Sequence, residues 1–375
     1  MTFTRACLLV LFPASIMLSV VRAGEQATPE LASLNQETVA LYRSGQYDRG
    51  VIVAKQALLL SEQNLGPDHA DVANALNNLA ILYRAQGRYA TAEPLYQRAL
   101  AINARALGPD HPFVAANMNN LALLYRTQGR YALAEPLYEG ALAINARAFG
   151  PEHPDVANSL NNLAELDRIR GRYAQAEPRY KRALDIHEKA FGPEHPAVAN
   201  SLNNLAELYR DQGLNDQSLP LYKRALAIYE KALGPEHPAV ATGLNNLAAL
   251  YTAQGQYPQA EPLYKRSLDI RQKTYGPEHP DVANSLNNLA ELYRNLDAPM
   301  QAEPLYTRAL AIYEKAFGPG HPGLATILTN LAALYAAQGR HALAEPLYQR
   351  ARAIRETALA SERGTQKQPL IVGDR

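Results

Sequence analysis

Two kinds of polar side chain recur along this sequence at a spacing that could support chemistry. One histidine lies in each of seven Gly-Pro-x-His segments, and an asparagine pair, replaced by Thr-Asn in the last copy, begins eight residues later. Imidazole binds metals and titrates near neutral pH, whereas a carboxamide offers two hydrogen-bond donors and an acceptor oxygen, which match a peptide backbone. These residues are therefore the first candidates for function.

The seven histidines are better explained by loop structure than by metal binding. They are His69, His111, His153, His195, His237, His279 and His321. None has a second histidine or a cysteine at the spacing of zinc ligands. We predict that each histidine hydrogen-bonds the backbone of its own loop, and we expect neither a metal nor a cofactor.

The interval from one histidine to the next is always 42 residues, and this interval defines the unit that positions the polar residues. Such a unit is too short to enclose a core alone, so neighbouring units must bury one another's apolar faces in an elongated stack. In the reference unit, a first helix carries one apolar face at Val72, Leu76, Leu79, Ala80 and Tyr83. A second helix does the same at Tyr89, Ala92, Tyr96, Ala99 and Ile102.

Glycine and proline mark the ends of these helices. Gly87 follows the first helix and recurs in most units, where a residue without a Cβ atom can adopt the left-handed conformation that closes a helix. Asp297 stands at this position in the sixth unit, and we expect a less regular turn there. Pro94 and its equivalents lie inside the second helix and are predicted to bend it slightly.

The units resemble the long tetratricopeptide repeats of kinesin light chains. The similarity lies in Leu-Asn-Asn-Leu-Ala-x-Leu-Tyr-Arg, in Ala-Glu-Pro-Leu-Tyr-x-Arg-Ala-Leu and in Gly-Pro-Glu-His-Pro, and it extends from Leu65 to Gly364. It implies an all-α fold, a right-handed α-solenoid of antiparallel helix pairs whose first helices line the concave surface. Residues 29–65 are then predicted to be a degenerate capping hairpin, 66–364 seven repeats and 365–375 a disordered tail.

The second polar stripe of the first helices is the predicted peptide-binding surface. Its amides are Asn77, Asn78, Asn119, Asn120, Asn161, Asn162, Asn203, Asn204, Asn245, Asn246, Asn287, Asn288 and Asn330. Asparagine ladders in related superhelical arrays clamp the backbone of an extended peptide, and the resemblance implies that role here. The alternative is that the amides hydrogen-bond each other or the neighbouring backbone and stiffen the stack.

Specificity is expected to come from five arginines further along the same stripe. They are Arg84, Arg126, Arg168, Arg210 and Arg294. The last three follow Glu165, Glu207 and Glu291 by three residues, a spacing at which opposite charges on a helix neutralise each other. The first two have no such partner in their own helix, so the N-terminal third of the surface is predicted to favour acidic or apolar side chains.

The third unit departs from the pattern at Asp167, which replaces the tyrosine found at Tyr83 and Tyr125. A charge on a core face is costly unless it is exposed or paired. The sequence leaves open whether this unit is a weak point or has a site of its own.

The first 23 residues differ from the rest and are predicted to be a signal peptide. Arg5 precedes an apolar stretch, and Val21-Arg22-Ala23 places small residues at a cleavage position. The alternative is a membrane anchor, although the stretch is short for one and contains Pro13. Cys7, the only cysteine, would be removed, so no disulfide is expected. We expect an exported protein, periplasmic or secreted, without a membrane span after cleavage.

Composition and motifs narrow the class of function. Lys and Arg number 37 against 36 Asp and Glu, so the chain has no excess positive charge for nucleic acid. Signatures such as Gly-x-x-x-x-Gly-Lys, His-Glu-x-x-His and Gly-x-Ser-x-Gly are missing, and we do not expect an enzyme. The prediction is a scaffold that binds a protein or peptide segment in its concave groove; no oligomeric state follows. The alternative is a structural spacer or assembly element that binds through its convex face or its ends.

Overall fold

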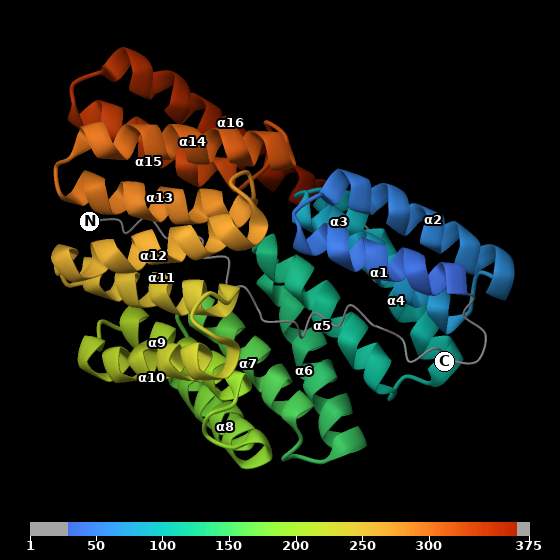
Figure 1. The fold of residues 1–375 in the computed structure, drawn as a ribbon. Coiled ribbons are helices and arrows are strands. Elements are labelled where there is room, and N and C mark those ends of the chain that lie inside the picture. Colours follow the sequence, from blue (N-terminus) through green and yellow to red (C-terminus); the bar gives the residue numbers. More distant parts are fainter. Residues whose placement is uncertain (1–28, 366–375) are drawn as a thin grey trace.

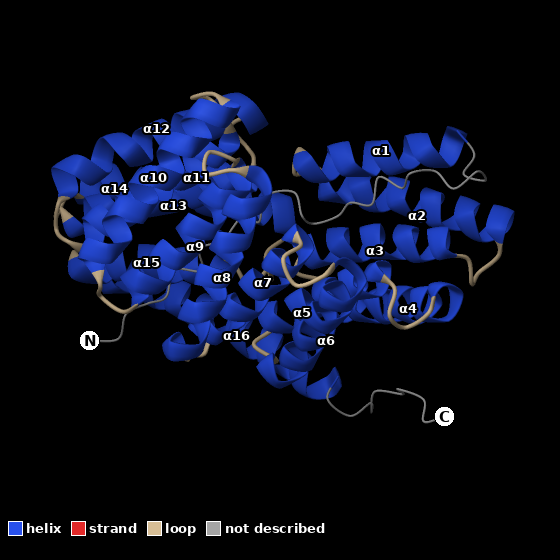
Figure 2. Cartoon of the chain, turned by 90° about the horizontal axis from the view of Figure 1, so that it is seen from below, coloured by secondary structure: helices blue, strands red, loops and turns tan. Residues whose placement is uncertain are grey.

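The computed structural model describes residues 29–365, a range that folds into sixteen helices and no strand (Figures 1 and 2). The first hairpin pairs α1 (Pro29–Arg43) with α2 (Tyr47–Leu65). Seven hairpins follow, with helices α3 (Ala70–Ala85), α4 (Tyr89–Leu107), α5 (Pro112–Thr127), α6 (Tyr131–Phe149), α7 (Pro154–Ile169), α8 (Tyr173–Phe191), α9 (Pro196–Asp211), α10 (Asn215–Leu233), α11 (Pro238–Ala253), α12 (Tyr257–Tyr275), α13 (Pro280–Asn295), α14 (Pro299–Phe317), α15 (Leu324–Ala337) and α16 (His341–Thr365). We number these seven hairpins as units one to seven.

Odd-numbered helices are called A helices and even-numbered helices B helices. Each helix packs against its neighbours in the chain, which makes the molecule an α-solenoid. Each A helix also contacts the A helix of the next unit, whereas successive B helices do not meet to a comparable extent. In a curved stack the inner elements lie closest together, so the A helices form the inner, concave side.

The predicted apolar faces form the core. In unit one, Val72, Leu76 and Ala80 of the A helix are fully buried, and so are Ala92 and Tyr96 of the B helix. Tyr89 lies at the start of its helix and is only half-buried. Small residues at the close approaches let the tyrosines of the B helices fill the space between hairpins, which is the packing expected from the alternation of sizes.

Six of the seven histidines cap the start of an A helix, and the seventh, His321, lies three residues before α15. In every loop the Nδ1 atom accepts a hydrogen bond from the backbone N–H two residues later, at 3.0–3.2 Å. In the first six loops this bond satisfies one of the N–H groups that a helix leaves free at its first turn, and in the seventh it holds the N–H of Gly323 just before the helix. The predicted structural role of the histidines is confirmed. Among residues 29–365, no group of three or more potential ligands could hold a metal ion.

The turns between A and B helices share one geometry, and the expectation of an irregular turn at Asp297 is wrong. Gly87 has a φ of 70°, and backbone bonds run from Arg88 N–H to the Tyr83 carbonyl and from Gly87 N–H to the Arg84 carbonyl. Asp297 has a φ of 52° and the equivalent bonds are present. A short polar side chain tolerates the left-handed conformation, so the hydrogen-bonded closure of α13 keeps its form.

Each B helix of the seven units continues through its internal proline, with Pro94 inside α4 as the first example. The A helix of unit seven begins later than the others, at Leu324, after Gly320 and Gly323 have replaced residues that favour a helix start. The predicted signal peptide lies outside the described residues, as does the predicted tail beyond Thr365, the last residue of α16. No helix within 29–365 is long and apolar enough to cross a membrane.

The stack turns back on itself, so that the ends of its first hairpins lie beside those of its last (Figure 1). A Cβ atom added to Gly45, in the turn before α2, would lie 2.8 Å from Cδ2 of His279. A Cβ atom added to Gly87 would lie 2.5 Å from Cδ2 of His321, and Tyr47 stacks on Phe317 with ring centroids 5.7 Å apart. Burial lowers the pKa of His321 to about 4. These end contacts join residues more than two hundred positions apart in the sequence.

Candidate functional site: the inner amide row and its arginines

The asparagine pairs of successive A helices are linked to one another on the inner side of the solenoid. Nδ2 of Asn120 donates to Oδ1 of Asn77 at 2.8 Å, a contact between units two and one. The same contact joins Asn288 to Asn245 at 2.8 Å and Asn330 to Asn287 at 3.1 Å. At these three junctions the second amide of one unit is held by the first amide of the unit before it, whereas Asn161 and Asn203 donate to Ser201 and Tyr229 instead.

The two members of a pair differ in exposure. The first members are mostly buried, at Asn77, Asn161, Asn203, Asn245 and Asn287, with Asn119 half-buried. The second members are half-buried in units two, three, four and six, at Asn120, Asn162, Asn204 and Asn288. Asn78, Asn246 and Asn330 are buried. We call Asn120, Asn162, Asn204 and Asn288 the amide row.

The pairing shows that some of the amides do hydrogen-bond each other, as the structural alternative supposed. It uses one N–H of the donating amide and leaves its oxygen and its other N–H for further bonds. The oxygens of Asn78, Asn119, Asn161 and Asn203 have no hydrogen-bond partner among the described residues. These four oxygens are themselves buried, so the hydrogen-bonding capacity that a ligand could reach is that of the half-buried second amides.

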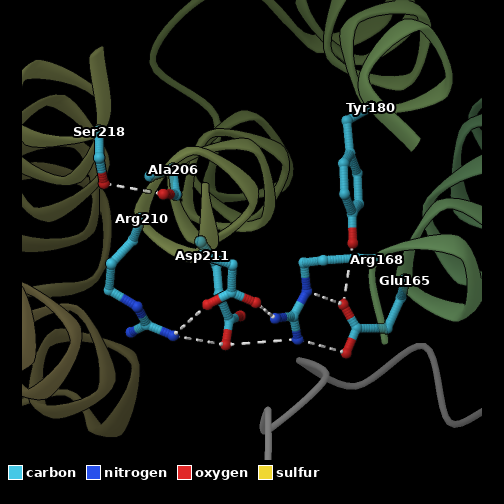
Figure 3. A network of polar contacts seen from close by, with 8 residues as sticks. Glu165, Arg168, Tyr180, Ala206, Arg210, Asp211 and Ser218 are labelled. Carbon is cyan, nitrogen blue, oxygen red and sulfur yellow. Dashed lines mark hydrogen bonds and ion pairs between the residues drawn. The ribbon is translucent and has the colours of Figure 1, made fainter. Parts of the chain in front are cut away.

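The predicted glutamate–arginine pairs of units three and four are present, and they join into one network (Figure 3). Arg168 contacts Glu165 at 2.8 Å in its own helix and Glu207 at 3.4 Å in the next. Arg210 lies 3.2 Å from Glu207, and Asp211 contacts both arginines. In unit six, Arg294 lies 3.5 Å from Glu291. The sequence did not single out Asp211, because its contact with Arg168 crosses between units.

The carboxylates of this central network differ in acidity. Burial by itself would raise the pKa of Glu165, but Arg168 and the hydroxyl of Tyr180, 2.9 Å from Oε2, hold it below its usual value. The pKa of Glu207 is raised, because burial and the nearby carboxylates outweigh Arg168 and Arg210. The arginine side chains are only 10% and 15% exposed. Their charge is thus committed to the fold and largely withheld from a ligand.

Arg84 and Arg126 lie in a different setting. Both are half-buried on the inner side. Arg84 adjoins Tyr96, and no carboxylate of the described residues lies within ion-pair distance of it. Arg126 contributes to lowering the pKa of Glu165 in the next unit. Arg84 is therefore the arginine of the stripe whose charge is least neutralised by the protein.

Asp167 of unit three is fully buried and paired. It contacts Arg172 at 2.6 Å and also Arg179, and Arg172 further contacts Glu135 at 2.6 Å. Arg179 stands where other units have leucine, as at Leu95 and Leu137. The departure from the repeat pattern is therefore a matched replacement of two residues, which assigns Asp167 a structural role.

Comparison with known proteins defines the class. The sequence profile of the tetratricopeptide repeat family matches residues 32–104, 71–144, 113–189, 155–231, 197–272, 239–299 and 281–357. The chain therefore belongs to the tetratricopeptide repeat family, whose arrays are generally non-enzymatic scaffolds for protein–protein interaction. The repeats are also similar in sequence, at 30% identity, to solved kinesin light chain-like repeats. A search of curated proteins gives no match.

Several solved structures are similar to this chain. BtubC (BKLC) from P. vanneervenii is 25% identical, covers 67% of this chain and 96% of its own, and superposes with a TM-score of 0.48. A Podosopora anserina putative kinesin light chain with nearly identical TPR-like repeats is 30% identical over 55% of this chain and 98% of its own, with a TM-score of 0.45. A Rap protein complexed with Competence and Sporulation Factor covers 88% of this chain and 99% of its own at 14% identity, with a TM-score of 0.57, a likeness of fold alone.

Proposed function

We propose that the chain is an interaction scaffold that holds an extended segment of a partner protein along the amide row. The observation that supports this most is the position of Asn120, Asn162 and Asn204, which are half-buried at the same place in consecutive units. They lie on A helices, the inner side of the solenoid; Asn120 uses one N–H for the bond to Asn77, and its remaining groups, like the amides of Asn162 and Asn204, are not engaged by such a bond. A row of amides at repeat spacing suits a backbone of any sequence. We propose no catalytic role.

The related Rap structure is consistent with this proposal, because that protein was solved in complex with Competence and Sporulation Factor. Its resemblance to this chain is one of fold. The argument for the present protein therefore rests on its own amides.

The proposal is tested with a phage-displayed library of random peptides. The strongest selected peptide is measured by fluorescence anisotropy against the wild-type chain and a variant with Asn120→Ala, Asn162→Ala and Asn204→Ala. We expect the variant to bind at least about tenfold more weakly, since each lost hydrogen bond to the peptide backbone contributes roughly 1 kcal/mol. N-methylation of the peptide backbone should weaken binding to the wild type by a similar factor.

The matched control changes three asparagines outside the row. Asn64 and Asn295 are exposed at the ends of α2 and α13, and Asn215 begins α10. Replacing all three with alanine should leave the affinity unchanged. Equal weakening by both triple variants, with helicity preserved in both, would reject the amide row as the binding surface.

We further propose that the N-terminal part of the row selects acidic side chains through Arg84. Reversing this charge, Arg84→Glu, should weaken an acidic peptide strongly, whereas Arg294→Glu should weaken it little because Arg294 already contacts Glu291. Arg126→Glu is less informative, since Arg126 also stabilises the charge of Glu165. Equal losses at Arg84 and Arg294 would contradict a graded surface.

We also propose that the protein is exported and cleaved after Ala23. The support is the sequence pattern of residues 1–23. Mass spectrometry of protein recovered from the native cell should give a chain that begins at Gly24. A mature chain that retains Met1 would contradict cleavage.

A further inference from the structure

The contact between the two ends of the solenoid is built from two recurring parts. One part is the turn between an A and a B helix, which supplies a glycine and, two residues later, an aromatic ring, as at Gly45 and Tyr47. The other part is the loop before an A helix, which supplies an aromatic ring four residues ahead of a histidine. Phe317 stacks on His321 at 4.4 Å in this way, and Tyr275 on His279 at 4.5 Å.

The glycines are what allow the two parts to meet. An added Cβ atom would lie within 3.0 Å of an imidazole atom at both Gly45 and Gly87. At the equivalent turn glycines Gly129, Gly171, Gly213, Gly255 and Gly339, nothing lies within 4 Å of such an atom. Of the seven described turns that have a glycine at this position, only the first two are therefore covered by loops of the same chain.

The loops show the same division into covered and uncovered copies. Phe317 is covered by Tyr47, whereas Phe149 and Phe191 remain 42% and 44% exposed. Both of these rings stack on their own histidines, His153 at 4.5 Å and His195 at 4.4 Å, as Phe317 does on His321. Other loop residues add to the exposed apolar surface, with Leu107 at 37% and Phe113 at 41%.

The uncovered loops and the uncovered turns lie on opposite edges of the solenoid. Every loop joins a B helix to the next A helix at one end of the hairpins, and every turn joins an A helix to its B helix at the other end. We define the loop edge by Leu107, Phe113, Phe149, Phe191 and Leu233. We define the turn edge by Gly129 with Tyr131, Gly171 with Tyr173, and Gly255 with Tyr257.

We propose that the turn edge of a second copy of this chain covers the loop edge. The contact would have the same geometry as the one within the chain, where the turns at Gly45 and Gly87 lie against the loops before α13 and α15. The end contact shows that these two surfaces fit each other; the uncovered turns at Gly129, Gly171 and Gly255 carry the same glycine and tyrosine, and the loops at Phe149 and Phe191 carry the same stacked ring and histidine. An exposed apolar row of this kind is typical of an interaction surface. Because the two edges differ, the contact is heterologous: a dimer keeps a free turn edge on one copy and a free loop edge on the other, so further copies add in one direction.

The stack leaves the inner side of each A helix untouched, so this inference is independent of the proposed peptide binding. It is tested with the full chain by sedimentation velocity over a wide concentration range. The wild type should associate beyond a dimer as its concentration rises. A wild type that stays monomeric throughout would overturn the proposal.

Two variants separate the edges. Phe149→Ser with Phe191→Ser removes the exposed rings of the loop edge. Gly129→Asn, Gly171→Asn and Gly255→Asn place a side chain on the turn edge, and asparagine tolerates the left-handed backbone of those turns. Each variant alone should associate at least about tenfold more weakly than the wild type. The control Ile52→Ser with Leu59→Ser alters two apolar residues of α2 that are even more exposed, at 59% and 56%, and lie away from both edges; it should associate normally.

A mixture of the two edge variants gives the decisive result. Each variant retains the edge that the other lacks, so the equimolar mixture should form a dimer with one intact contact and stop there. A mixture that remains monomeric, or a control variant that loses association, would overturn the heterologous contact. Circular dichroism confirms that each variant is folded, and a variant that fails this check is replaced by Phe191→Ser alone or Gly171→Asn alone.

Discussion

Unit three and the regular units solve the same packing problem with different chemistry. In units two, four, six and seven, a tyrosine near the end of the A helix donates to a glutamate of the preceding B helix. These bonds are Tyr125 to Glu93, Tyr209 to Glu177, Tyr293 to Glu261 and Tyr335 to Glu303, at 2.8–2.9 Å. In unit three, Asp167 replaces the tyrosine, and Arg172 links it to Glu135, the equivalent glutamate.

The comparison shows that the residue tolerated near the end of the A helix, tyrosine or aspartate, depends on the side chains that surround it. A tyrosine hydroxyl reaches the glutamate directly, because its ring spans the distance between the hairpins. Aspartate is too short for that and carries a charge, so it needs a cation on either side, and Arg172 and Arg179 provide them. A buried ion pair must offset its desolvation, whereas the tyrosine buries mainly apolar surface.

The sharpest way to break the comparison is to remove Asp167 alone. Asp167→Leu removes the fully buried carboxylate and leaves Arg172 and Arg179, which are 27% and 31% exposed, without that partner; we expect a loss of about 3 kcal/mol in the free energy of unfolding, the lower end for breaking a buried ion pair. Urea unfolding followed by circular dichroism measures it. The matched control is Asp110→Leu, whose carboxylate is 66% exposed beside Arg147, and which should cost less than about 1 kcal/mol. Similar losses for both variants would refute a buried, structural ion pair.

Converting unit three to the regular form should leave the stability unchanged or raise it, whereas removing Asp167 alone lowers it. Asp167→Tyr together with Arg179→Leu restores the residues of the other units and offers the introduced hydroxyl to Glu135. Replacing a buried ion pair with well-packed residues is neutral or stabilising by about 1 to 4 kcal/mol, so the melting temperature should stay or rise. A melting temperature that falls below that of the wild type would mean that unit three is adapted to its charges beyond this pair.

Much of this architecture could be predicted because it depends on residues within one unit. The helices, the loop role of His69 and its equivalents, and the pairing of Glu165 with Arg168 all follow from spacings inside a single hairpin. The closure at Asp297 was mispredicted because the residue type was given more weight than the hydrogen bonds that fix the turn.

Contacts between units were harder to predict, and contacts between the ends were missed. The bond from Asn120 to Asn77 and the contact of Asp211 with Arg168 depend on how far one hairpin is rotated against the next. Small rotations accumulate along the stack, and only their sum places Gly45 beside His279. A repeating sequence specifies the structure of one unit far more strongly than it specifies the total rotation along the stack.

The regular bond can be tested against a unit that lacks it. Tyr293→Phe removes the hydroxyl that donates to Glu261 at 2.8 Å, and we expect a loss of about 1 to 2 kcal/mol, since the acceptor is charged. Unit five provides the control, because Leu219 stands in place of the glutamate that would face Tyr251. Tyr251→Phe should therefore change the free energy of unfolding very little. Equal losses in the two units would assign the effect to ring packing.

The smallest expected effect is the pH dependence of the same bond. Lys265 and the hydroxyl of Tyr293 lower the pKa of Glu261 below its usual value. A carboxylate with a lowered pKa stabilises the fold above its unfolded pKa, and this contribution is lost as the pH falls through the folded value. Between pH 7 and pH values below about 4, the wild type should lose slightly more stability than Tyr293→Phe does. Thermal melts of both proteins measure the difference, and Tyr251→Phe should follow the wild type. If Tyr293→Phe and the wild type lose stability in parallel, the hydroxyl does not contribute to holding Glu261 ionised.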